Sequence, residues 1–80
     1  MQNMRIDHGV QPAKLVIVQR RLQIKDIAAR IGYTPWWMSV ILDGRANATP
    51  RFRTLLSVYL DLDEAELFNY GLPEREPVPS

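Results

Sequence analysis

The sequence predicts an all-α domain built from five short helices. Apolar residues recur at spacings of three and four within residues 24–31 and again within residues 52–60, which is the period of one helical face. Proline stands at Pro12, Pro35 and Pro50, each where a helix would begin, because the first helical position does not need the N–H that proline lacks. The chain has 80 residues, which suits one small domain.

The two ends of the chain are expected to lie outside this domain. Residues 1–10 are polar and lack periodicity, so we expect a flexible arm in which His8 is exposed to solvent. Residues 71–80 contain three prolines and should form a flexible, proline-rich tail. The folded domain is therefore predicted to span residues 11–70.

The first helix is predicted at residues 11–22. Leu15 and Val16 give it a wider apolar surface than one face requires, and they would contact either the last helix or a second subunit. The residues expected to face the core are Ala13, Ile17, Val18 and Leu22.

Residues 23–45 predict two helices joined by a tight turn. Gly32 follows the last apolar residue of the first helix, where a left-handed C-cap is expected. Thr34 then offers an N-cap hydroxyl to a second helix that begins at Pro35 and ends at Gly44. Helix, short turn and helix form the helix-turn-helix unit, whose second helix can lie in the major groove of DNA.

Two more helices are expected after residues 45–50, a loop of turn-forming residues. Thr49 is the candidate N-cap of a helix that runs through residues 51–62. Asp63 is expected to cap a short fifth helix, with Glu66 completing a capping box.

Composition argues against several classes of protein. The chain has no cysteine, so it forms no disulfide or thiolate metal site and suits a reducing cytoplasm. Its longest apolar run, residues 15–18, is far shorter than the ~20 residues of a membrane span. There is one histidine, no phosphate-binding glycine loop and no cluster of metal ligands. We therefore expect no enzyme, cofactor, metal or small-molecule ligand.

Charge is divided unevenly along the chain. Residues 1–60 contain nine lysines and arginines against three acids, a net charge of +6. Residues 61–80 contain one arginine against six acids, a net charge of −5. The positive part suits a polyanion as partner, but an ordinary solvated surface accounts for the charges equally well.

Together these features resemble the phage repressor and Cro-type helix-turn-helix family, also called xenobiotic-response-element or lambda-repressor-like regulators. The resemblance covers residues 12–70, and its strongest parts are DIAARIG (26–32), TP (34–35), ILDGR (41–45), PRF (50–52) and YLDLDEAELF (59–68). It implies a compact five-helix, lambda-repressor-like domain that binds double-stranded DNA as a homodimer. Such a protein would be a small cytoplasmic, nucleoid-associated repressor of phage, plasmid or bacterial origin.

The resemblance also implies which residues meet DNA. The start of the second helix of the unit would reach base edges, the following loop would contact the backbone, and Arg51 would approach a narrow minor groove. These residues are Thr34, Pro35, Trp36, Trp37, Ser39, Val40, Arg45, Asn47 and Arg51. Additional candidate phosphate contacts are Arg20, Arg21, Lys25 and Arg53. Basic residues at a helix end, such as Arg20 and Arg21, equally suit the helix dipole. The candidate dimer surface comprises Tyr59, Leu62, Phe68 and Tyr70.

The sequence departs from the family at two kinds of position. Base-reading positions that often hold Gln, Asn, Arg or Lys hold Pro35, Trp36 and Val40 here. An arginine–glutamate pair of relatives is replaced by Ile17 and Leu42. Because two apolar residues are compatible where an ion pair was buried, we expect Ile17 and Leu42 to touch.

Trp36 has three interpretations. Its ring could pack on a sugar or a thymine methyl while its N–H donates to a phosphate. It could instead anchor a protein partner, since tryptophan is enriched at binding hot spots, or lie flat on a neighbouring residue. Two functions follow: a DNA-binding regulator, or a protein-interaction module such as an antitoxin or a subunit of a larger DNA complex that uses Trp36 and Trp37.

Overall fold

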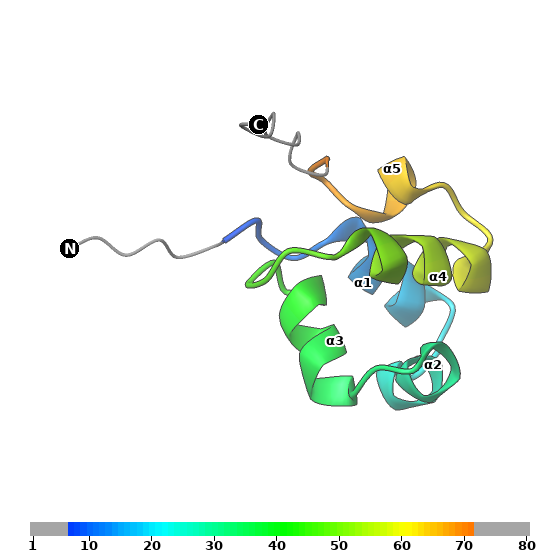
Figure 1. Ribbon diagram of the computed structural model, residues 1–80. Helices are drawn as coiled ribbons and strands as arrows, with labels where there is room; N and C mark the ends of the chain where they lie inside the picture. The colour runs from blue at the N-terminus through cyan, green and yellow to red at the C-terminus, as the bar shows by residue number, and fades with distance from the viewer. Residues whose placement is uncertain (1–6, 72–80) are drawn as a thin grey trace, which may run out of the picture.

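The structure is a computed structural model that describes residues 7–71, and this part of the chain contains five α-helices and no strand (Figure 1). The predicted all-α class is therefore confirmed for these residues. None of their helices is long and apolar enough to cross a membrane. The helices are α1 (Pro12–Gln19), α2 (Ile24–Ile31), α3 (Pro35–Leu42), α4 (Pro50–Leu60) and α5 (Glu64–Leu67).

The core is built around α4. Phe52, Leu56 and Leu60 recur every four residues along it, and all three are fully buried. In Figure 1, α5 lies on one side of α1 and α4, and α2 and α3 lie on the other. Ile17 and Leu42, which we expected to touch, both belong to this buried cluster. The packing leaves one side of α3 without a covering helix.

The end of α2 and the starts of α3 and α4 follow the local sequence as predicted. The predicted end of α4 at residue 62 is wrong, because Asp61 adopts a left-handed conformation with φ of +60° and the helix ends at Leu60. Gly32 adopts a left-handed conformation with φ of +84° at the C-cap of α2. The Thr34 hydroxyl accepts a hydrogen bond from the backbone N–H of Trp37 (3.1 Å), and the Thr49 hydroxyl accepts one from Phe52 (3.1 Å). Both N-caps are therefore confirmed.

The capping box predicted for α5 is wrong. Asp63 is the N-cap residue, but its side chain makes no capping hydrogen bond. The backbone N–H of Glu66 donates instead to the Asp63 carbonyl oxygen (2.9 Å). This main-chain bond occupies the donor that the box would have used, and α5 is only a single turn.

The first helix is shorter than predicted, and its buried face is partly different. Arg21 has a φ of +59°, and the N–H of Leu22 donates to the Ile17 carbonyl oxygen (2.9 Å), so α1 ends at Gln19. Val18, which was expected in the core, is 63% exposed, whereas Val16 packs against the core. The buried face is set by the i, i+4 pair Ala13 and Ile17, and Val18 turns away from it.

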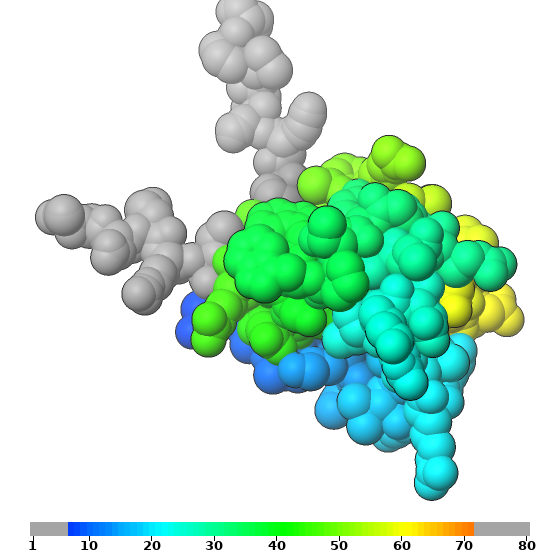
Figure 2. All heavy atoms as spheres, turned by 90° about the horizontal axis from the view of Figure 1, so that it is seen from below, coloured from blue at the N-terminus to red at the C-terminus, as the bar shows by residue number. Residues whose placement is uncertain are grey.

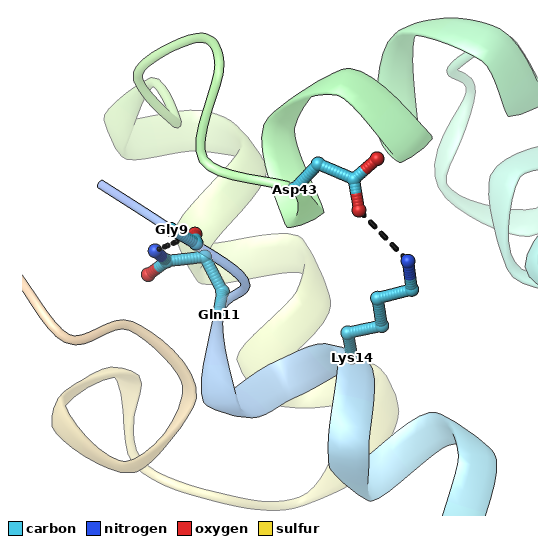
Figure 3. A network of polar contacts seen from close by, with 4 residues as sticks. All are labelled: Gly9, Gln11, Lys14 and Asp43. Carbon is cyan, nitrogen blue, oxygen red and sulfur yellow. Dashed lines mark hydrogen bonds and ion pairs between the residues drawn. The ribbon is translucent and has the colours of Figure 1, made fainter. Parts of the chain in front are cut away.

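The predictions of a flexible arm and an exposed His8 are wrong for residues 7–10, which dock on the domain. The backbone N–H of His8 donates to the Gly44 carbonyl oxygen (2.9 Å). Gln11 is fully buried; its amide donates to the Gly9 carbonyl (2.9 Å) and accepts from the backbone N–H of Asn69 (2.9 Å). Figure 3 shows Gln11 turned back toward Gly9 below the end of α3. Residues 1–6 of the arm and 72–80 of the tail lie outside the described residues.

Candidate nucleic-acid interface

The side of α3 that faces away from the core is open. Figure 2 shows α3, in green, on one face of the molecule with α2 beside it. Trp36 is 70% exposed and Trp37 is 37% exposed, and their ring centroids lie 5.8 Å apart at an angle of 32°. Thr34 and Pro35 are exposed as well, and Ser39 and Val40 are half-buried. Six of the predicted site residues thus come together on α3 and its N-cap.

Helical geometry explains this display. Met38, Ile41 and Leu42 are fully buried, so they fix which side of α3 faces the core. Residues four apart share a side of a helix, so Trp36 and Val40 stand one turn apart. Trp36 is therefore the more exposed of the two tryptophans, and the smaller, half-buried Val40 lies one turn behind it.

Exposed basic residues precede and follow α3 along the chain. Arg45 and Arg51 are exposed after α3 and at the start of α4, and Lys25 and Arg30 are exposed on α2. None of them forms an ion pair within residues 7–71, where Lys14–Asp43 is the one such pair. Of the charged residues between positions 20 and 53, seven are basic and two acidic, whereas residues 54–71 contain four acids and no base. Arg20 and Arg53 have partners inside the domain, so the segment around α3 keeps five exposed basic residues against the acids Asp26 and Asp43, a net positive charge.

Lys14 forms an ion pair with Asp43, the acidic residue at the C-terminal end of α3. Its ammonium lies 2.8 Å from the carboxylate of Asp43, the C-cap residue of α3 (Figure 3). Both side chains are partly exposed, so the pair contributes little to stability. It does reduce the repulsion that Asp43 would exert on an anion lying along α3.

Arg53 is not available for a phosphate contact, so that prediction is wrong. It is only 3% exposed, and its Nη2 donates to the Tyr70 carbonyl oxygen (2.7 Å). The guanidinium carbon lies 4.5 Å from the ring centroid of Phe68 and 4.6 Å from that of Tyr70. A guanidinium held between two aromatic faces is stabilised by cation–π attraction, which explains why this charge is buried.

Arg20 also has an internal partner. Its Nη1 donates to the carbonyl oxygen of Leu60, the last residue of α4 (2.7 Å). A cation at a helix C-terminus interacts favourably with the helix dipole, so the dipole interpretation fits Arg20 better than a phosphate contact. Arg21 and Lys25 remain exposed.

The loop that carries Arg45 and Asn47 is bonded to residues near both ends of the described chain, His8 and Tyr70. His8 Nε2 lies 2.7 Å from Asn47 Oδ1, and the His8 ring stacks on Tyr70 with centroids 3.7 Å apart. The backbone N–H of Ala48 donates to the Tyr70 hydroxyl (2.7 Å). Asn47 is exposed but already bonded, so within this loop Arg45 is the better candidate for a backbone contact.

Not all residues of the candidate dimer surface are free to contact a second subunit. Phe68 is 3% exposed and Tyr70 is tied to His8, Ala48 and Arg53, so both contact other residues of this chain. Tyr59 and Leu62 are half-buried and keep some surface. The prediction is therefore wrong for Phe68, which is buried against Arg53, and it stays a prediction for Tyr70, which is half-buried like Tyr59 and Leu62.

Two contributors to this surface were missed in the sequence. Arg30 occupies the exposed side of α2, and its place follows from the buried Ile27 and Ile31. The spacing of the apolar residues in this helix could therefore have predicted that Arg30 is exposed. The Lys14–Asp43 pair joins residues 29 positions apart, and no local pattern marks it.

Comparisons of this chain with protein-family models, with curated proteins and with solved structures found no significant match.

Proposed function

We propose that this protein is a sequence-specific regulator that binds double-stranded DNA with α3 in the major groove. The observation that carries the proposal is the open side of α3 together with the exposed basic residues that precede and follow this helix in the chain and have no ion-pair partner among the described residues. In a helix-turn-helix unit the second helix occupies the groove while the surrounding residues hold phosphates. Here residues 32–34 join α2 to α3 in that order.

The dimensions suit this mode of binding. An α-helix with its side chains is about 10–12 Å across, and the major groove is about 12 Å wide, so a helix such as α3 fits within it. Arg45 and Arg51 then stand beyond the C-terminal end of α3, where the DNA backbone borders the groove. The resemblance to phage repressors supports the same placement, with a homodimer on half-sites about 34 Å apart. Such a regulator would act as a repressor in the cytoplasm, associated with the nucleoid.

Arg51→Ala is expected to weaken DNA binding and to reduce the dependence of binding on salt. Each phosphate contact contributes about −0.9 to the slope of log K against log salt, so the slope should become shallower by about one unit. Binding would be measured by fluorescence anisotropy over a series of salt concentrations. Gln19→Ala, at another exposed position, is the matched control. Unchanged affinity and slope would remove Arg51 from the interface.

A second candidate function is supported by the exposure of Trp36. An indole that is 70% exposed is typical of a protein-binding hot spot as well as of a nucleic-acid contact. The chain would then be an antitoxin or a subunit of a larger DNA complex. Salt separates the two functions, because an apolar protein interface shows little salt dependence whereas phosphate contacts produce a steep one.

Trp36→Ala is expected to lower DNA affinity by about tenfold while leaving the free energy of unfolding within about 0.5 kcal/mol of wild type. The side chain is exposed, so little core packing is lost. Met38→Ala in the same helix is the contrasting control, since Met38 is fully buried and its truncation should cost about 2–5 kcal/mol. Urea unfolding of the wild type and the two variants measures the free energies of unfolding. A large loss of stability in Trp36→Ala would show that Trp36 serves the core.

A further inference from the structure

The α3 helix lacks the side chains that usually read bases. Its sequence, PWWMSVIL, contains no carboxamide, guanidinium, ammonium or carboxylate group. Its polar side-chain groups outside the core are the indole N–H groups of the two exposed tryptophans and the hydroxyl of the half-buried Ser39, together with the Thr34 hydroxyl at the N-cap. The Thr34 oxygen already accepts a hydrogen bond from the N–H of Trp37.

This chemistry restricts what α3 can distinguish in a major groove. Guanine is read by bidentate donors and adenine by a carboxamide, and α3 offers neither. An indole N–H makes a single bond, and a serine hydroxyl accepts or donates to several bases. The remaining feature that differs between base pairs is the C5-methyl group of thymine, which is read by apolar contact.

The apolar side chains of α3 that reach the surface stand where such a contact requires them. Trp36 is 70% exposed, and Val40, which is half-buried against the core, follows one turn behind it on the same side of the helix. Trp37 borders them, with its ring centroid 5.8 Å from that of Trp36. Even without Arg20 and Arg53, which have internal partners, five exposed basic residues stand against two acids between positions 20 and 53, and this excess complements a polyanion, so the occupant of this apolar face is duplex DNA rather than an apolar protein surface.

We propose that α3 recognises its site mainly through the methyl groups of thymine, with Trp36 as the principal contact and Val40 as the second. This inference rests on the proposed function and names how that site reads sequence. The recognised sites would be rich in thymine at the positions under α3, and the basic residues would supply the sequence-independent part of the affinity.

The test replaces thymine by uracil in the bound duplex. Uracil keeps every hydrogen-bonding group of thymine and lacks only the methyl. A duplex selected by the protein from random DNA is remade with single uracils inside the bound site, and with uracils outside it as the matched control. Burial of one methyl corresponds to about a fourfold change in affinity, so each contacted thymine should lose about fourfold and two should lose about fifteenfold.

Variants of the protein show which side chain is responsible for the preference for thymine over uracil. In Trp36→Ala the uracil that replaces the thymine contacted by Trp36 should cost no affinity, because the methyl no longer has its partner, whereas a uracil at the thymine contacted by Val40 should still cost about fourfold. In Arg51→Ala both duplexes should bind more weakly and by the same factor, since Arg51 lies outside α3. Discrimination that survives Trp36→Ala at full size would overturn the role of Trp36.

The outcomes separate this inference from the proposed function. Equal binding of the thymine and uracil duplexes by the wild-type protein overturns methyl recognition and leaves DNA binding intact. Binding to no duplex, by protein that is folded by circular dichroism, overturns both. A loss that appears only for uracils inside the bound site supports the inference.

Discussion

Gly44→Ala is expected to destabilise the fold by about 3 kcal/mol or more. Gly44 has a φ of +82°, and a residue with a Cβ in that conformation costs roughly 1–2 kcal/mol. The new Cβ would also overlap the backbone oxygen and nitrogen of Gly9. Backbone atoms cannot move aside as a flexible side chain does, so the arm would leave its place and the hydrogen bond from His8 to Gly44 would be lost.

Gly32→Ala is the matched control for this prediction. Gly32 has nearly the same φ, +84°, but its Cβ would meet nothing within 4 Å. It should therefore show only the conformational cost of roughly 1–2 kcal/mol. Urea unfolding of both variants measures the difference, which reports the docked arm. Equal losses in the two variants would mean that residues 7–10 do not lie against Gly44.

Arg53→Ala is expected to cost about 3 kcal/mol, which corresponds to a fall of about 12–24 °C in Tm for a domain of this size. The change leaves a cavity between two aromatic rings and removes a hydrogen bond from a charged donor. Relief of the buried charge offsets part of this loss, since Nε of Arg53 has no partner. Differential scanning calorimetry measures the effect.

Two variants make the interpretation of Arg53 specific. Arg53→Met refills the space and should recover about half of the lost stability, because it restores packing without the hydrogen bond. Arg51→Ala, two residues away on the exposed side of α4, should leave Tm unchanged and weaken DNA binding instead. A small effect of Arg53→Ala, similar to that of Arg51→Ala, would contradict the burial of Arg53.

The features that were predictable from sequence are those set by neighbouring residues. A threonine before a proline defined the starts of α3 and α4, and Gly32 defined the end of α2, because a cap involves atoms only a few positions apart. The inward face of α3 also followed from its helical period. The exposure of Trp36 was therefore within reach of the sequence.

The features that were not predictable depend on distant partners. Gln11 bonds to Asn69 across 58 positions, and Arg53 is buried only because Phe68 and Tyr70 return to enclose it. Without those partners a glutamine and an arginine are expected at the surface. Docking of residues 7–10 has the same origin, since the arm lies against Gly44 and Tyr70. Two of the predicted contact residues, Arg53 and Phe68, are buried for this reason.

Selection of binding sites from random duplex DNA at about physiological salt tests the central claim most directly. The proposed function predicts a recovered motif, palindromic with half-sites about one helical turn apart, whose binding weakens with salt by about −0.9 in log–log slope per phosphate. Recovery of no motif by folded protein, or binding that does not change with salt, would contradict it and direct the search to a protein that covers Trp36 and Trp37.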